Sequence, residues 1–109
     1  MDGIWLCITA SKRYEKPDAL KSNAFGVRDL LLDMVKTRSG NWERAYVIDS
    51  GAVKGIRENK IKLLGAEPVF IDTDLETCLK RNECDRDKNK AQIKRWDRYI
   101  RDWFRDYTE

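Results

Sequence analysis

The chain has 109 residues, of which 38% are charged and 41% hydrophobic, and its formal net charge is +3. This length allows one domain with a modest core. The whole positive excess lies in residues 80–109, which allows an anionic partner there without requiring one. The absence of histidine excludes a nucleophile that is activated by a histidine base.

The N-terminal third contains one ambiguous apolar run and one predicted helix. The run Ile4–Ile8 is continuous, so its periodicity cannot separate a buried strand from a helix. From Leu20 to Met34 the apolar residues recur at alternating steps of four and three. This spacing predicts a helix over residues 19–38, with Gly40 well placed to end it.

Two short β-branched segments are typical of buried strands, namely Arg44–Asp49 and Glu67–Asp72. A helix is predicted between them over residues 53–64, with Gly65 as its C-terminal cap. Four of its apolar side chains are expected to face inward: Val53, Ile56, Leu63 and Leu64. Strands separated by a helix of this length form a βαβ unit, so the predicted fold class is α/β, with the two strands parallel.

Two more helices are predicted in the C-terminal third. Thr73 and Glu76 match a capping box that opens a helix over residues 74–82. The polar residues 82–90 are expected to form a mobile, lid-like loop before a last helix over residues 90–107. That helix carries an apolar stripe: Ile93, Trp96, Ile100, Trp103 and Tyr107. Such a row of aromatic side chains forms part of a core more often than a platform for a ligand.

Acidic residues follow both predicted strands. In parallel α/β sheets, ligands bind outside the carboxyl ends of the strands, so Asp49 is the candidate catalytic residue. It would hold Mg²⁺ through water or orient a hydroxyl group for phosphoryl transfer. The alternative, that Asp49 caps a turn, stays open. For Asp74 we expect an ordinary helix cap.

A set of basic residues follows the same pattern of strand and helix, namely Arg57, Lys80, Arg81 and Arg86. The planar guanidinium group suits phosphate oxygens, which makes the arginines candidate phosphate ligands. Arg81 and Arg86 flank the polar loop and would let it close over a nucleotide. Taken singly, each of these residues is more often an ordinary surface residue.

The stretch YVIDSGAVKGIRENKIKLLGAEPVFIDTDLETCLKRNECDR resembles the second half of P-loop nucleotide and polynucleotide kinases. It keeps their order of a strand ending in Asp, an Arg-bearing helix, Leu-Gly-Ala, a strand, an acidic turn and a helix ending in Cys-Leu-x-Arg. The likeness is greatest to small phage-type P-loop ATPase/kinase proteins and covers roughly residues 2–107. It implies ATP and Mg²⁺ as cofactors of the complete fold, with Asp49 near the metal or acceptor and Arg57, Arg81 and Arg86 facing phosphate.

The phosphate-binding signature of that family, Gly-x-x-x-x-Gly-Lys-Ser/Thr, does not occur in this sequence. The resemblance therefore implies a partial parallel sheet without its central strand, which in the family lies between the two strands predicted here. Both bordering strands would be left with unpaired backbone groups. We expect them to pair directly, or to be completed by Ile4–Ile8 or by a second copy of the chain.

Three functions remain open on these grounds. The first is a fragment or remnant of an ATP-dependent phosphotransferase that is inactive alone and needs a complementing P-loop half to act on a nucleotide or nucleic-acid end. The second is a non-catalytic protein-interaction module, and the third is a small nucleic-acid-binding protein. No apolar run suits a membrane span. The cysteines Cys7, Cys78 and Cys84 lack the spacing of zinc ligands, which favours no metal site and a cytoplasmic protein with reduced thiols.

Overall fold

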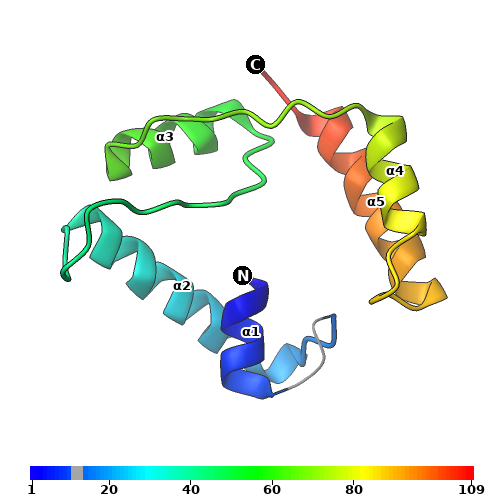
Figure 1. Ribbon diagram of the computed structural model, residues 1–109, viewed down its shortest axis with the longest axis horizontal. Coiled ribbons are helices and arrows are strands. Elements are labelled where there is room, and N and C mark those ends of the chain that lie inside the picture. Colours follow the sequence, from blue (N-terminus) through cyan, green and yellow to red (C-terminus); the bar gives the residue numbers. More distant parts are fainter. Residues whose placement is uncertain (11–13) are drawn as a thin grey trace. The chain divides into compact units, whose positions relative to one another are not determined.

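The computed structural model describes residues 1–10 and 14–109, and the elements that it contains are helices (Figure 1). They are α1 (Asp2–Thr9), the short 3₁₀ helix η1 (Asp18–Leu20), α2 (Lys21–Lys36), α3 (Lys54–Leu64), α4 (Leu75–Glu83) and α5 (Lys90–Asp106). Within the described residues there is no strand, so the predicted α/β fold is wrong. The chain divides into two compact units, Met1–Ala45 and Tyr46–Glu109.

The two segments expected to be strands, Arg44–Asp49 and Glu67–Asp72, run without regular secondary structure on either side of α3 in the sequence. The two segments do not form strands because neither has an adjacent strand to which its backbone can hydrogen-bond. A strand is defined by its hydrogen bonds to an adjacent strand, and two strands without a third are marginal in water. The predicted parallel pairing does not form, and the two segments remain single connections between helices.

In the first unit, α1 packs against α2 through a small apolar contact. The side chain of Trp5 on α1 is buried, and Ala24 on α2 is fully buried, which lets the helices approach closely. An ion pair of 2.7 Å between Lys16 Nζ and Asp2 Oδ1 joins the start of α1 to the segment before η1. The run Ile4–Ile8 lies within α1 and is helical. The expectation that it could complete a sheet is wrong for this structure.

The predicted helix over residues 19–38 is confirmed as α2, but its end differs from the prediction. Arg38, not Gly40, adopts the first left-handed conformation after the helix, with φ of 57°. The backbone N–H of Arg38 donates to Val35 O at 3.2 Å, and that of Ser39 donates to Met34 O at 2.9 Å. These two bonds are those of a Schellman motif, in which a glycine is usually found at the position of Arg38.

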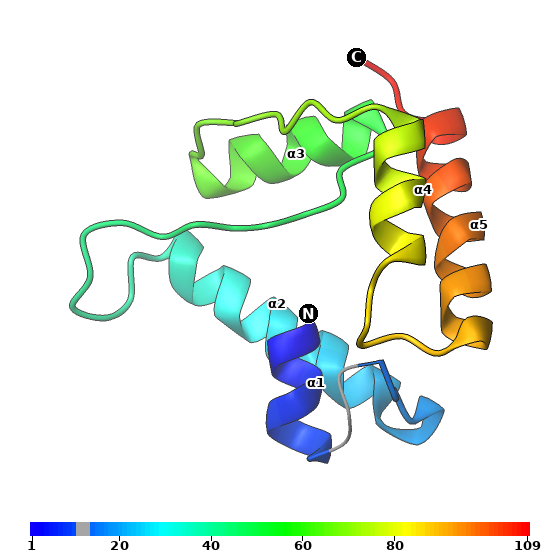
Figure 2. The same ribbon diagram turned by 45° about the vertical axis from the view of Figure 1, so that its right-hand side comes forward.

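In the second unit, α4 and α5 lie side by side as a helical hairpin (Figures 1 and 2). The predicted helices over 74–82 and 90–107 are confirmed, but the predicted capping box at Thr73 is wrong. The cap lies one residue later, where the Asp74 carboxylate accepts hydrogen bonds from the backbone N–H of Thr77 at 3.0 Å and from its hydroxyl at 2.6 Å. This holds the pKa of Asp74 below its usual value, as the helix-cap interpretation requires.

The connection between α4 and α5 is built around the buried side chain of Asn82. Asn82 Nδ2 donates to Ile93 O at 2.9 Å, and its Oδ1 accepts from Lys88 Nζ at 2.9 Å. The Lys88 ammonium also lies 3.4 Å from Asp85 and 4.7 Å from the centre of the Trp96 ring. The residues expected to form a lid-like loop are thus tied to both helices.

The helix predicted over 53–64 is confirmed as α3, and Gly65 caps it with φ of 59°. Its inward face is smaller than expected, because Leu64 is buried while Val53, Ile56 and Leu63 are exposed. On α4, Cys78 is half-buried, and all three cysteines are free thiols. None of the helices in the described ranges is long and apolar enough to cross a membrane.

Candidate functional site

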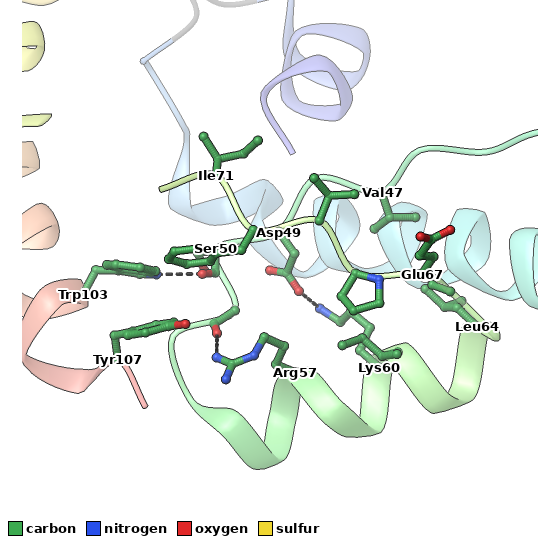
Figure 3. Close-up of a pocket in the computed structure, with 16 residues that line it drawn as sticks. Val47, Asp49, Ser50, Arg57, Lys60, Leu64, Glu67, Ile71, Trp103 and Tyr107 are labelled. Atoms are coloured by element: carbon green, nitrogen blue, oxygen red, sulfur yellow. Dashed lines mark hydrogen bonds and ion pairs between the residues drawn. The ribbon is translucent and has the colours of Figure 1, made fainter. Parts of the chain in front are cut away.

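The second unit contains an open pocket of about 420 Å³ (Figure 3). Its walls come from α3, from the C-terminal end of α5 and from two connecting segments. We call residues 46–49 the first extended segment and residues 67–72 the second extended segment. Both segments contribute side chains to this one pocket, Val47 and Asp49 from the first and Val69, Phe70 and Ile71 from the second.

Asp49 lies at the pocket wall and forms an ion pair with Lys60 of α3 (Figure 3). Partial burial acts to raise the pKa of Asp49. The hydrogen bond and charge of Lys60, with the backbone N–H groups of Ser50 and Gly51, outweigh that effect and hold the pKa below its usual value. Asp49 is therefore an ionised, paired carboxylate rather than a proton donor, and a general-acid role at neutral pH does not fit it.

Arg57, on the first turns of α3, is occupied by contacts within the chain. Its Nη1 donates to Gly51 O at 2.6 Å, its Nη2 donates to Thr108 O, and its guanidinium lies 5.2 Å from the centre of the Tyr107 ring. A phosphate would have to compete with these two carbonyl oxygens for the guanidinium donors. The arrangement makes Arg57 a clamp between the start of α3 and the end of α5.

Trp103 of α5 and Tyr107, the residue that follows the helix, form one wall of the pocket. Trp103 and Tyr107 stack with their ring centres 4.9 Å apart, and Phe70 of the second extended segment stacks on Tyr107 at 5.4 Å. The indole N–H of Trp103 also donates to Ser50 O at 2.6 Å. The half-buried ring of Trp103 thus holds the turn that follows the first extended segment.

The sequence-predicted site residues are only partly brought together. Asp49 and Arg57 both line the pocket, whereas Arg81 and Arg86 are exposed on the α4–α5 hairpin and do not line it. Lys60 was missed by the sequence reasoning, although its spacing of three residues from Arg57 places both on one face of α3. Trp103 and Tyr107 were recognised as a packing stripe but not as partners of the turn at residues 50–52.

Both extended segments expose most of their apolar side chains. Ile48 is 98% exposed and Ile71 is 78% exposed, and Tyr46 and Val69 are exposed to a similar degree. In the part of the chain that the structure describes, the backbone groups of residues 46–49 and 67–72 make no hydrogen bond to another protein group. Each segment therefore presents both an apolar row and an unpaired backbone row.

Some basic side chains of α5 form ion pairs within the helix, whereas Lys90, Lys94 and Arg95 are exposed and form no ion pair with the described residues. Arg101 Nε lies 2.8 Å from Asp97, and Arg105 Nη1 lies 2.8 Å from Asp102. These pairs, at helical spacings, partly offset the positive charge of Arg101 and Arg105. The nucleic-acid-binding function stays a prediction.

No cluster of three or more possible metal-binding side chains occurs within residues 1–10 and 14–109. Comparison of the chain with protein-family models, with curated proteins and with solved structures found no match.

Proposed function

We propose that this chain is a protein-interaction module whose residues 46–109 bind an extended, apolar segment of another polypeptide. One observation carries the proposal. The first and second extended segments border the same pocket, expose their apolar side chains and leave their backbone groups without hydrogen bonds.

The chemistry of these segments selects the kind of partner. Burying a backbone N–H or C=O group without a hydrogen bond is costly, so a partner that covers the segments must also satisfy a regular row of such groups. An extended polypeptide does this by main-chain pairing, and it places alternate side chains into the pocket. An apolar small molecule would cover the side chains and leave the backbone unpaired.

Two sources could supply such a segment, namely a second copy of this chain and a separate chain that complements it. Sedimentation of the protein alone at micromolar concentration separates them. Concentration-dependent dimerisation supports the second copy. A monomer that still binds an added strand supports a separate chain.

The binding test uses a short peptide of alternating valine and threonine, with terminal lysines for solubility, and measures its affinity by calorimetry. We expect saturable binding to the wild-type protein and a loss of roughly tenfold or more in Val47→Lys and Ile71→Lys, because a buried unpaired charge is costly. Both side chains are exposed in the free protein, so these changes should not affect its folding. Ile56→Lys is the matched control, since Ile56 is exposed on α3 and lies outside the pocket.

Failure of the wild-type protein to bind the peptide, together with a monomer in sedimentation, would contradict the proposal. Equal losses in Ile56→Lys and in the two segment variants would also contradict it, since binding would then not use this pocket.

A second candidate is the inactive part of a nucleotide or polynucleotide kinase, which would act on a nucleotide or nucleic-acid end once a complementing P-loop half is bound. The observation in its favour is that Asp49, Lys60 and Arg57 line one pocket. Detection of phosphoryl transfer after mixing with such a half would support it. Unchanged transfer in Asp49→Asn would contradict a role for that carboxylate.

A further inference from the structure

The residues that follow α5 cap the start of α3. The N-cap of α3 is Val53, which has no side-chain acceptor. The missing acceptor comes from the other end of the unit, where Thr108 Oγ1 accepts a hydrogen bond of 3.0 Å from the backbone N–H of Lys54. The backbone N–H of Thr108 in turn donates to Ala52 O at 3.1 Å. One exposed threonine therefore satisfies groups on both sides of the N-cap.

Arg57 fastens the same residues from inside α3. It donates to the carbonyl oxygens of Gly51 and Thr108, and its guanidinium covers the ring of Tyr107. Gly51 has φ of 49°, a conformation that suits glycine, so the connection at residues 50–52 leaves the extended conformation just where the first extended segment ends. The direction of that segment therefore depends on how the turn is held.

We infer that Tyr107 and Thr108 form a C-terminal latch that fixes the turn at residues 50–52 and so aims the first extended segment along the pocket. The inference rests on the proposed function and adds that the latch controls how readily a strand docks. With the latch closed, Val47 and Asp49 already line the pocket. With the latch open, the turn gains conformational freedom, and this freedom must be lost again when a strand docks. Thr108 is a positioning residue in this account, since it acts on the docking segment through the turn.

The Thr108 side chain can release Lys54 without disrupting the rest of the unit. Thr108 is exposed, and its side-chain contact is a single hydrogen bond to Lys54. The α4–α5 hairpin is held by other groups, among them the buried Asn82 and its bond to Ile93 O. Local opening of exposed hydrogen bonds costs less than global unfolding.

The test compares Thr108→Val, which removes the hydroxyl and keeps the side-chain shape, with Thr108→Ser, which keeps the hydroxyl. Thr37→Val is the control, because the Thr37 hydroxyl bonds only to the backbone of its own helix end in the first unit. Two quantities are measured: the exchange rate of the Lys54 amide in the free protein, and the affinity for the valine–threonine peptide.

We expect Thr108→Val to speed exchange of the Lys54 amide and to weaken peptide binding by roughly three- to tenfold, the range for one lost hydrogen bond. Thr108→Ser should restore both quantities, and Thr37→Val should change neither. Unchanged Lys54 exchange in Thr108→Val would overturn the latch itself. Faster exchange with unchanged affinity would overturn its control of docking. Absence of peptide binding in the wild type would instead overturn the proposed function, which is a different result from equal binding by wild type and variant.

Discussion

Trp103 on α5 donates its indole N–H to the backbone carbonyl of Ser50 over 2.6 Å, across 53 positions of the sequence. The face of the same ring stacks on Tyr107. Trp103 thus uses its N–H group to hold the turn after the first extended segment and its ring face to pack against Tyr107. This contact joins the C-terminal helix to the pocket wall, which the pattern of apolar residues in α5 could not indicate.

Replacing Trp103 by phenylalanine should remove the hydrogen bond and keep most of the stacking. We expect Trp103→Phe to lower the free energy of unfolding by about 1 kcal/mol, the usual contribution of one such bond. Urea unfolding measures this. A variant as stable as the wild type would show that the Ser50 contact does not persist in solution.

Asp49 gives the stability a defined dependence on pH. Its folded pKa lies below the ordinary value of 3.8, so the Asp49–Lys60 pair stabilises the folded state fully above that value. This contribution is lost as the pH falls through the folded pKa. The difference in stability between wild type and Asp49→Asn should therefore be constant near neutral pH and shrink in the acid range. A difference that grows as the pH falls would contradict this sign.

The end of α2 carries a removable strain. Arg38 has φ of 57°, a conformation that costs a residue with a side chain about 1 kcal/mol relative to glycine. Replacing Arg38 by glycine would remove this cost but would also remove the contact of the arginine with the Trp42 ring, 5.7 Å away. We expect Arg38→Gly to raise the thermal midpoint slightly. Arg44→Gly is the control and should not raise it, since Arg44 has no positive φ.

Asn82 is the buried polar centre of the α4–α5 connection. Asn82→Ala removes its bonds to Ile93 O and Lys88 Nζ, so we expect a loss of about 1–3 kcal/mol in the free energy of unfolding. Asn59→Ala, at an exposed position of α3, should be near neutral. Similar effects of the two changes in chemical denaturation would mean that the predicted mobile loop is correct and the network is not formed.

The helices α2 to α5 could be predicted because their signals are local, whereas the continuous apolar run of α1 left strand and helix undecided. The stripe of α5 and its capping box, in which Asn89 and Gln92 bond reciprocally at 2.9 Å, both lie within one element. The strands failed because a strand needs a partner that the local pattern of Arg44–Asp49 does not specify. Asp49 and Arg57 both reach the pocket because Asp49 ends the first extended segment and Arg57 lies on the first turn of α3, with only a short connection between them. Arg81 was selected because it follows the predicted strand and helix and flanks the polar loop, and without the predicted sheet this order does not bring it to the pocket.

The most direct measurement is amide hydrogen exchange of the two extended segments with and without the valine–threonine peptide. We predict fast exchange at residues 46–49, 67 and 69–72 in the free monomer and marked slowing at both segments when the peptide saturates. Slow exchange in the free monomer would mean that the segments already pair with each other. Unchanged fast exchange at saturating peptide would contradict docking at these segments.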